Sequence, residues 1–149
     1  MDVKVDAYLP DGYVPDSSDR LELYRRIAQV RSSEEREDVL DELFDRFGEP
    51  PAPVLRLLDV AQLRSRCMHA GIDSIRQDGF TCLIRFIPAA PIDGVKLFAL
   101  LTGWDGKLAL TAKEPPTLRL ILPRDEKKPV LELLLELTEQ LGACRRQEN

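Results

Sequence analysis

The sequence predicts an α+β fold, in which an extended amino-terminal arm and three helices precede a β-β-α-β-β-α segment. In the first half, three stretches repeat apolar residues every three or four positions, which is the spacing of amphipathic helices. In the second half, short apolar stretches come in pairs separated by turn residues, which is typical of β-hairpins and predicts a mainly antiparallel sheet covered by helices. No internal repeat or long linker interrupts the chain. We therefore expect a single domain over residues 1–142 and a frayed tail over 143–149.

The extended arm covers about the first dozen residues. Apolar and polar side chains alternate there until Pro10 and the Asp11-Gly12 turn signal, a pattern typical of extended backbone. A first helix is expected over about residues 20–31, opened by a capping box of Asp19 and Glu22.

Two more helices are expected before the sheet. The second opens at a capping box of Ser32 and Glu35 and ends after Phe47 at Gly48. The third follows two prolines and runs to about Ala70. The residues expected to face inward are Leu21, Tyr24, Ile27 and Ala28 in the first helix, Leu40, Leu43, Phe44 and Phe47 in the second, and Val54, Leu57, Leu58, Ala61 and Met68 in the third.

The sheet is expected to contain two hairpins. Strands are predicted over 72–76 and 80–87, joined across Gln77-Asp78-Gly79, and over 107–112 and 117–122. A short helix over about 92–102 separates the pairs, and a last helix begins near Pro129 and ends at Gly142. The inward residues of that last helix are expected to be Val130, Leu131, Leu134, Leu135, Leu137 and Leu141.

Composition limits the function. The 149 residues are 44% hydrophobic and 32% charged, with a formal net charge of −5. Direct binding of DNA is not expected, because duplex nucleic acid requires a basic footprint. No apolar run reaches the length of about 18 residues that a membrane span needs, and no membrane contact is expected. The three cysteines are odd in number and far apart, which favours free thiols in a reducing compartment, with Cys82 in the core.

The motifs of catalysis are missing from the sequence. It contains no GxxxxGK[ST], no GxSxG, no CxxC and a single histidine, His69. We therefore expect no catalytic, cofactor-binding or metal site in this chain. Adjacent carboxylates at 34–35, 37–38 and 41–42 fit a solvated helix face better than an acid/base pair. Trp104 lies at a turn, where we favour a core position over the alternative of an anchor for a partner.

Three blocks of sequence carry a resemblance to a known family. They read DAYLPDGYVPD at residues 6–16, RLELYRRIA at 20–28 and ELFDRFGEPP at 42–51. The pattern AY(I/L)P..Y(I/V), RL..Y(K/R)(K/R) and EL.DRFG..P occurs in this order and at suitable spacing. Over about residues 6–75 the chain thus resembles the carboxy-terminal domain of bacterial transcription-repair coupling factors, while the later region fits in length and element order with weaker motifs. Gly12 stands where an acid is expected, a departure that affects a turn.

The resemblance implies a role within a longer protein. The parent of this family is an ATP-driven DNA translocase that displaces stalled RNA polymerase and recruits nucleotide-excision repair in the bacterial cytoplasm. Its motor, which uses ATP and Mg²⁺, lies upstream, so Met1 is not expected to be the natural start. The carboxy-terminal domain is implied to be an autoinhibitory cover. It docks on the amino-terminal module of the same protein and hides the surface used by the damage-recognition ATPase of repair.

The resemblance also implies which residues dock. The family's contacts involve charged residues of the EL.DR block, which fall here on Glu42, Asp45 and Arg46. On a helix these three share one face, turned away from the apolar stripe. Glu42 and Asp45 would accept hydrogen bonds from arginines of the partner, and Arg46 would pair with an acid there. Phe44 and Phe47 are expected to hold the helix on its own core.

Two alternative functions remain open from the sequence. The domain could be an adaptor that itself recruits a polymerase or a repair protein. It could also be an auxiliary nucleic-acid-binding module that uses Arg64, Arg66 and Arg76, in which case binding would depend strongly on salt.

Overall fold

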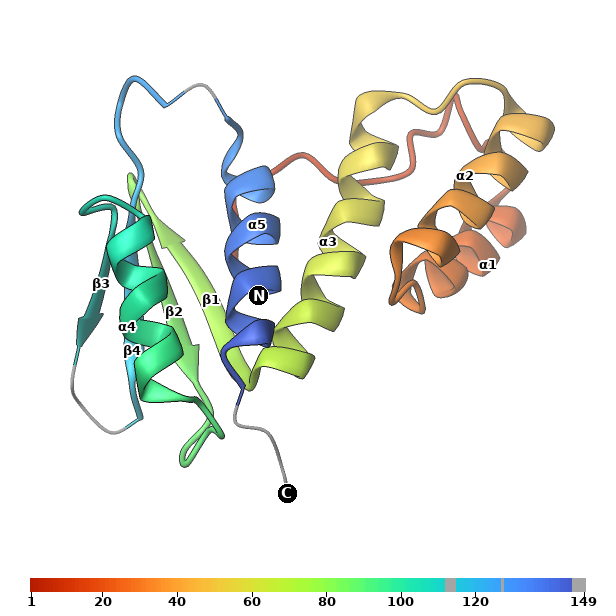
Figure 1. Cartoon of the computed structure of the whole chain (residues 1–149). Coiled ribbons are helices and arrows are strands. Elements are labelled where there is room, and N and C mark those ends of the chain that lie inside the picture. Colours follow the sequence, from red (N-terminus) through yellow and green to blue (C-terminus); the bar gives the residue numbers. More distant parts are fainter. Residues whose placement is uncertain (112–114, 127, 146–149) are drawn as a thin grey trace. The chain divides into compact units, whose positions relative to one another are not determined.

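The computed structural model describes residues 1–111, 115–126 and 128–145. The chain forms two compact units, a helical unit, Val5–Ser65, and a sheet unit, Met1–Lys4 with Arg66–Asn149. The predicted domain over residues 1–142 thus consists of two units. The described residues form an α+β fold of helices and antiparallel strands, as the sequence predicted (Figure 1).

The first helix, α1, covers Ser17–Ala28 and begins earlier than predicted. The predicted capping box was wrong, because the side chain of Asp16, not of Asp19, accepts the backbone N–H groups of Ser18 and Asp19. A start three residues earlier leaves Asp19 inside the first turn, where its charge is favourable to the helix dipole.

Of the predicted inward residues of α1, Ile27 is confirmed and the other three were wrong. The buried residues are Leu23 and Ile27, whereas Leu21, Tyr24 and Ala28 are exposed. The choice between the two stripes depends on what the helix packs against, because both Leu21 and Leu23 fit an apolar spacing. The hydroxyl of Tyr24 accepts the backbone N–H of Leu9 from the arm at 2.9 Å.

The core of the helical unit lies between α1, α2 (Ser33–Phe47) and α3 (Ala52–Ala70), whose residues up to Ser65 belong to this unit. Its buried residues are Leu9, Val14, Leu23, Ile27, Val30, Val39, Leu43, Val54, Leu58 and Ala61. The predicted inward position of Met68 in α3 was wrong, because this side chain is 80% exposed.

The sheet unit contains four antiparallel strands in the order β1-β2-β4-β3. They are β1 (Ile72–Asp78), β2 (Thr81–Phe86), β3 (Leu108–Thr111) and β4 (Thr117–Ile121). The two predicted hairpins are present. The β1–β2 turn is Gly79-Phe80, one step later than predicted, and Gly79 takes φ +59° as a two-residue hairpin turn requires. The predicted end of the third strand at Ala112 and part of the following turn lie outside the described residues.

Two helices accompany the sheet, α4 (Gly94–Gly103) and α5 (Val130–Ala143) (Figure 1). Asp93 caps α4 by accepting the backbone N–H groups of Val95 and Lys96. In α5 the buried residues are Leu131, Leu133, Leu134, Leu137, Thr138 and Leu141. Leu133 is thus buried although it was not predicted to face inward. Val130 and Leu135, which were predicted to face inward, are only half-buried. Cys82 is fully buried, as predicted.

The end of the described chain is more ordered than the predicted frayed tail. Helix α5 continues through Gly142 to Ala143. Cys144 is buried, and its carbonyl accepts the backbone N–H of Asp93 at 2.7 Å. Arg145 forms an antiparallel bridge with Ile92. Residues 146–149, the rest of the predicted tail, lie outside the described part of the chain. Among the described residues no helix is long and apolar enough to cross a membrane.

A candidate docking face on the second helix

Both ends of α2 are fixed by polar contacts. Ser32 caps the start by accepting the backbone N–H of Glu35 at 3.1 Å, and the Glu35 carboxylate accepts the backbone N–H of Arg31 at 2.7 Å. At the other end Gly48 takes φ +86°, and its carbonyl accepts the hydroxyl of Tyr13 at 2.9 Å. The predicted start and end of this helix are thus confirmed, and its orientation within the helical unit is set at both ends.

The buried side of α2 differs from the predicted stripe at one important position. Val39 and Leu43 are buried, and Leu40 and Phe47 are half-buried against the same core. Phe44 was predicted to hold the helix on its core, but it is 60% exposed. Val39 and Leu43 are four residues apart and set the inward direction, so Phe44, one residue beyond Leu43, is turned about 100° away from it.

Two of the three predicted docking residues make ion pairs inside the helical unit. Glu42 pairs with Arg26 of α1, and Arg46 pairs with Asp19 of α1 at 3.6 Å. The Arg46 guanidinium also lies 4.9 Å from the centre of the Phe47 ring. The side chains of both pairs remain 35 to 39% exposed. Glu42 and Arg46 therefore sit along the contact between α1 and α2 with one side still open to solvent.

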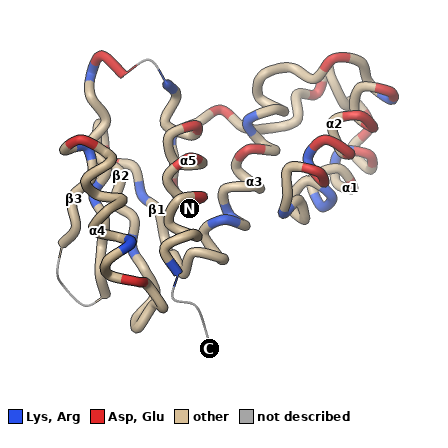
Figure 2. The backbone as a smooth tube through the Cα atoms, in the orientation of Figure 1, with Lys and Arg blue, Asp and Glu red and all other residues tan. Residues whose placement is uncertain are grey.

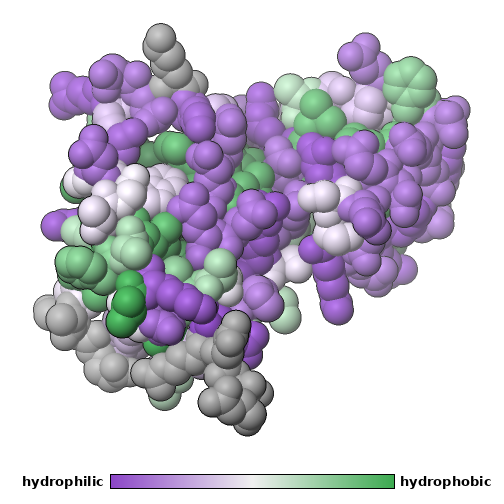
Figure 3. Space-filling model, in the orientation of Figure 1, coloured by the Kyte–Doolittle hydropathy of each residue, from purple (hydrophilic) through white to green (hydrophobic). Residues whose placement is uncertain are grey.

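Asp45 is placed differently. It is exposed and has no ion pair or hydrogen bond with the side chains of the described residues. Asp41, also exposed, lies one turn before it, and exposed Phe44 lies beside it. We call Asp41, Phe44 and Asp45 the outer face of α2. Figure 2 shows how acidic residues recur along α2, and the surface in this region is mostly hydrophilic in the view of Figure 3.

The outer face thus combines carboxylates with one exposed aromatic ring. Sequence reasoning found Asp45 but missed Phe44 as a surface residue. The pattern alone could not show this, because Val39 and Phe44 are alternative members of an apolar stripe that includes Leu43. A partner that docked here would meet a phenylalanine ring, a residue type enriched at protein interfaces, next to a free carboxylate.

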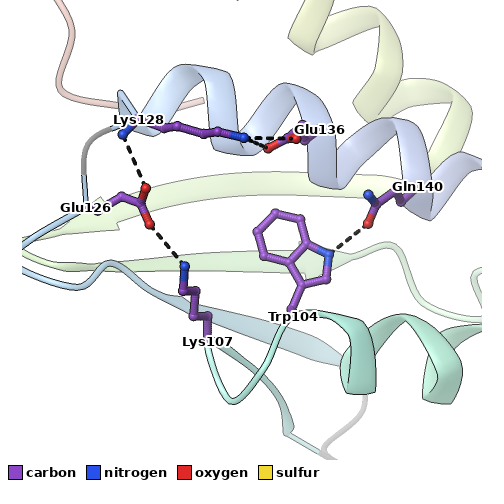
Figure 4. Close-up of polar contacts among 6 residues, drawn as sticks. All are labelled: Trp104, Lys107, Glu126, Lys128, Glu136 and Gln140. Atoms are coloured by element: carbon purple, nitrogen blue, oxygen red, sulfur yellow. Dashed lines mark hydrogen bonds and ion pairs between the residues drawn. The ribbon is translucent and has the colours of Figure 1, made fainter.

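A second polar site lies in the sheet unit around Trp104. Its cavity has a volume of about 490 Å³ between the end of α4 and α5, with Lys107, Glu126 and Lys128 on its rim. The indole N–H of Trp104 donates to Gln140 at 2.8 Å (Figure 4). Trp104 is half-buried at this wall, so it is neither the fully buried core residue that the sequence favoured nor a freely exposed anchor.

The charges around this cavity are already paired with one another. Lys107 donates to Glu126 at 3.1 Å, and Lys128 donates to Glu136 at 3.3 Å (Figure 4). The backbone N–H of Lys128 and the ammonium of Lys107 lower the pKa of the Glu126 carboxyl. The network connects the loop before α5 with the start of β3 and with α5 itself. Its internal pairing fits a structural role for these side chains.

The cysteines and other ligand-type residues give no sign of a metal centre in the described part of the chain. Cys67, Cys82 and Cys144 are free and buried, and burial raises the pKa of Cys67 to about 12 and that of Cys82 to about 11. No group of three or more His, Cys, Asp or Glu residues is placed to hold a metal among the described residues. Protonated, buried thiols are poor nucleophiles.

The two units, an α-helical one and an antiparallel sheet flanked by helices, define an α+β domain with exposed carboxylates and an exposed aromatic ring on α2. Comparisons with known proteins agree with this. The family model of the TRCF domain matches residues 3–97. A transcription-repair-coupling factor of Staphylococcus epidermidis is 36% identical over 100 residues, which are 66% of this chain and 9% of that protein. One from Bacillus subtilis is 35% identical over 102 residues, 67% of this chain and 9% of that protein.

A solved structure covers nearly the whole chain. The crystal structure of the C-terminal domain of a transcription-repair coupling factor is similar with a TM-score of 0.87 and 25% identity, covering 97% of this chain and 91% of that one. The chain belongs to the TRCF domain family and has the fold of the C-terminal domain of these proteins. It spans about 9% of the length of the curated relatives that it matches.

Proposed function

We propose that this chain is a regulatory domain of a transcription-repair coupling factor and that the outer face of α2 docks on the amino-terminal module of the same protein. In that position it masks the surface that the damage-recognition ATPase of repair would use. The parent is then an ATP-driven DNA translocase that acts on stalled RNA polymerase, with ATP and Mg²⁺ in its motor and none required in this domain. The family membership supports the parent, and the outer face supports the docking.

One observation carries the docking proposal. Asp45 is exposed and without an ion pair among the described residues, and Phe44 beside it is an exposed apolar ring. Their neighbours Glu42 and Arg46 are held in place by α1 and still open to solvent on one side. Glu42 and Arg46 are therefore preorganised beside the outer face, and a partner would not have to order these two long side chains on binding.

The expected interaction energies suit a docked state, here called the latch, that is closed within one chain and can be opened. An interface between domains of one chain typically buries about 600–1,500 Å² and is fairly polar. A tether supplies an effective concentration in roughly the millimolar range, so a contact that is weak between separate molecules stays closed within one chain. Holding the closed state at about 99% requires only about 3 kcal/mol. Loss of one partner of a desolvated ion pair costs about 2–5 kcal/mol, which is enough to open it.

The test is to titrate this chain with the separate amino-terminal module of its parent. Asp45→Arg should weaken binding at least tenfold, because the arginine would face the cations that Asp45 is proposed to meet. Phe44→Ala should weaken it as well. Glu139→Arg is the matched control, because Glu139 is an exposed helical carboxylate of the sheet unit. In the full-length parent, Asp45→Arg should raise the affinity for the repair ATPase.

Equal binding by the Asp45→Arg and Glu139→Arg chains would place the latch elsewhere. Deletion of the domain from the parent separates a cover from an adaptor, because removing a cover exposes a binding site and removing an adaptor abolishes recruitment.

The alternative of a nucleic-acid-binding module receives less support from the structure. The Arg66 guanidinium donates to the Leu135 carbonyl at 2.8 Å, which occupies it within its own unit.

A further inference from the structure

One face of the sheet in the sheet unit is lined by arginines. Side chains alternate between the two faces of a strand, and in β2 the buried Cys82, Ile84 and Phe86 point to one face. Leu83 and Arg85 therefore point to the other face, and both are exposed. In β4 and β1 the same alternation places exposed Arg119 and Arg76 on this face. We call it the open face of the sheet.

The pairing of the strands brings the three arginines together around one leucine. Leu83 pairs with Arg76 of β1 on one side and with Arg119 of β4 on the other. Because neighbouring strands are about 4.8 Å apart, the two arginines flanking Leu83 have Cα atoms about 10 Å apart. Arg85 lies two residues further along β2 and therefore about 7 Å from Leu83 on the same face. The long guanidinium side chains can reach a common ligand above Leu83.

The side chains of these arginines have no polar partner in the described part of the molecule. None of Arg76, Arg85 and Arg119 forms an ion pair or a side-chain hydrogen bond with the described residues. The acids of β1 lie toward its two ends, Asp73 beside the register shift near its start and Asp78 opposite Thr81 at its last position. The backbone of Asp2 pairs with that of Arg76 at the edge of β1. None of these carboxylates lies within ion-pair distance of an arginine of this face.

The open face is also partly apolar. Leu83 is 38% exposed between the arginines, and Ile121 of β4 is 41% exposed. No aromatic residue belongs to β1, β2 or β4 on this face, so the stacking platforms that hold single-stranded nucleic acids on other open sheets are missing here. Arginines around apolar residues are, in contrast, the usual composition of a protein interface.

We propose that the open face binds an acidic protein segment through Arg76, Arg85 and Arg119, with an apolar side chain of that segment resting on Leu83. The guanidinium forks match carboxylates, which they can bind with two hydrogen bonds each. An amphipathic helix with acids at i and i+7 presents carboxylates about 10.5 Å apart, with residues i+3 and i+4 between them. That spacing fits the pair of arginines that flank Leu83. The open face belongs to the sheet unit and the outer face of α2 to the helical unit, and this proposal does not depend on the proposed docking of α2.

The probe is a fluorescein-labelled helical peptide with Glu at i and i+7 and Leu at i+3 and i+4, added to the whole chain and followed by fluorescence anisotropy. We expect saturable binding that weakens as salt is raised. Arg76→Glu, Arg85→Glu and Arg119→Glu together should weaken binding at least tenfold. Arg76→Gln with Arg119→Gln should also weaken it and adds no negative charge to the sheet. Amide shifts in NMR spectra should concentrate in β1, β2 and β4.

The matched control reverses three exposed arginines of the helical unit, Arg25, Arg31 and Arg64, and changes the net charge by the same amount. It should bind the peptide like the unmodified chain. Thermal unfolding of each variant verifies that it is folded. The proposal is overturned by an absence of peptide binding, by equal weakening in the control, or by a scrambled peptide of the same composition binding as well. Preferential binding of a labelled single-stranded oligonucleotide would overturn it in favour of a nucleic-acid surface.

Discussion

Asp19 of α1 and Arg46 of α2 form an ion pair with a distance of 3.6 Å between a guanidinium nitrogen and a carboxylate oxygen. Arg46 was predicted from the family resemblance to meet a partner, and within the helical unit it already has an acid beside it. The pair is partly exposed, so its energy is in the range of about 0–1 kcal/mol. Arg46 can therefore serve both to join two helices and to border a docking face, and mutation has to separate these two roles.

A charge swap separates them. Arg46→Glu alone should lower the free energy of unfolding by up to about 1 kcal/mol, because it places two acids side by side. Combining it with Asp19→Arg should recover the part of this loss that comes from the pair itself, while the arginine in the first turn of α1 keeps a small cost from the helix dipole. If Arg46 also binds the amino-terminal module, the swap will not restore docking. Urea unfolding and binding titrations of the two variants provide the measurements, and recovery of both properties would limit Arg46 to its structural role.

Phe44 and Leu43 are neighbours in sequence with opposite environments. Leu43 is fully buried, so Leu43→Ala should cost about 2–5 kcal/mol of stability. Phe44→Ala should change stability by less than about 0.5 kcal/mol, since surface substitutions usually do. Denaturant unfolding of both variants tests the position of α2 on its core. A large loss of stability for Phe44→Ala would show that the ring is buried.

Gly48 has a backbone conformation that other residues rarely adopt. Its φ of +86° and ψ of −166° fall in a region used almost entirely by glycine, although an added Cβ would touch nothing within 4 Å. Gly48→Ala should therefore cost about 1–3 kcal/mol through backbone strain alone. Gly12→Ala is the control, because Gly12 has equal space and no positive φ. Calorimetric melting should show a lower midpoint for Gly48→Ala only.

Alkaline pH should destabilise the sheet unit through its buried thiols. Burial raises the pKa of Cys82 to about 11 from an ordinary value of 9.0. A raised pKa in the folded state means that the contribution is fully present below pH 9 and is lost as the pH rises toward 11. Urea unfolding at pH 8 and pH 10.5 measures the decline. Cys82→Ala should show a smaller decline over this interval, and an unchanged decline would exclude Cys82 as a source.

The existence and order of the elements could be predicted from the sequence, because helix caps, glycine stops and hairpin turns act over a few residues. Ser32 and Gly48 mark α2 in both sequence and structure. Which side of each helix is buried was less predictable. Leu21 and Met68 were expected inside and are exposed, since an apolar residue beside the true stripe fits the same spacing. What an amphipathic helix buries depends on the element that packs against it.

The candidate site was partly predictable for the same reason. The family motif pointed to Glu42, Asp45 and Arg46, and their docking role stays a prediction. Sequence could not show that Glu42 and Arg46 pair with Arg26 and Asp19, because those residues are distant in the chain and meet only when α1 packs on α2. The arginines of the open face are equally scattered and become neighbours only through the strand order.

Local sequence signals determined where this protein's helices and strands begin and end, because backbone groups at those points need a cap, a turn residue or a glycine nearby. Tertiary packing decided which side of each helix is buried and which charges become neighbours. Those outcomes arise from contacts between distant segments, and several apolar or charged residues in each segment were equally suited to make them.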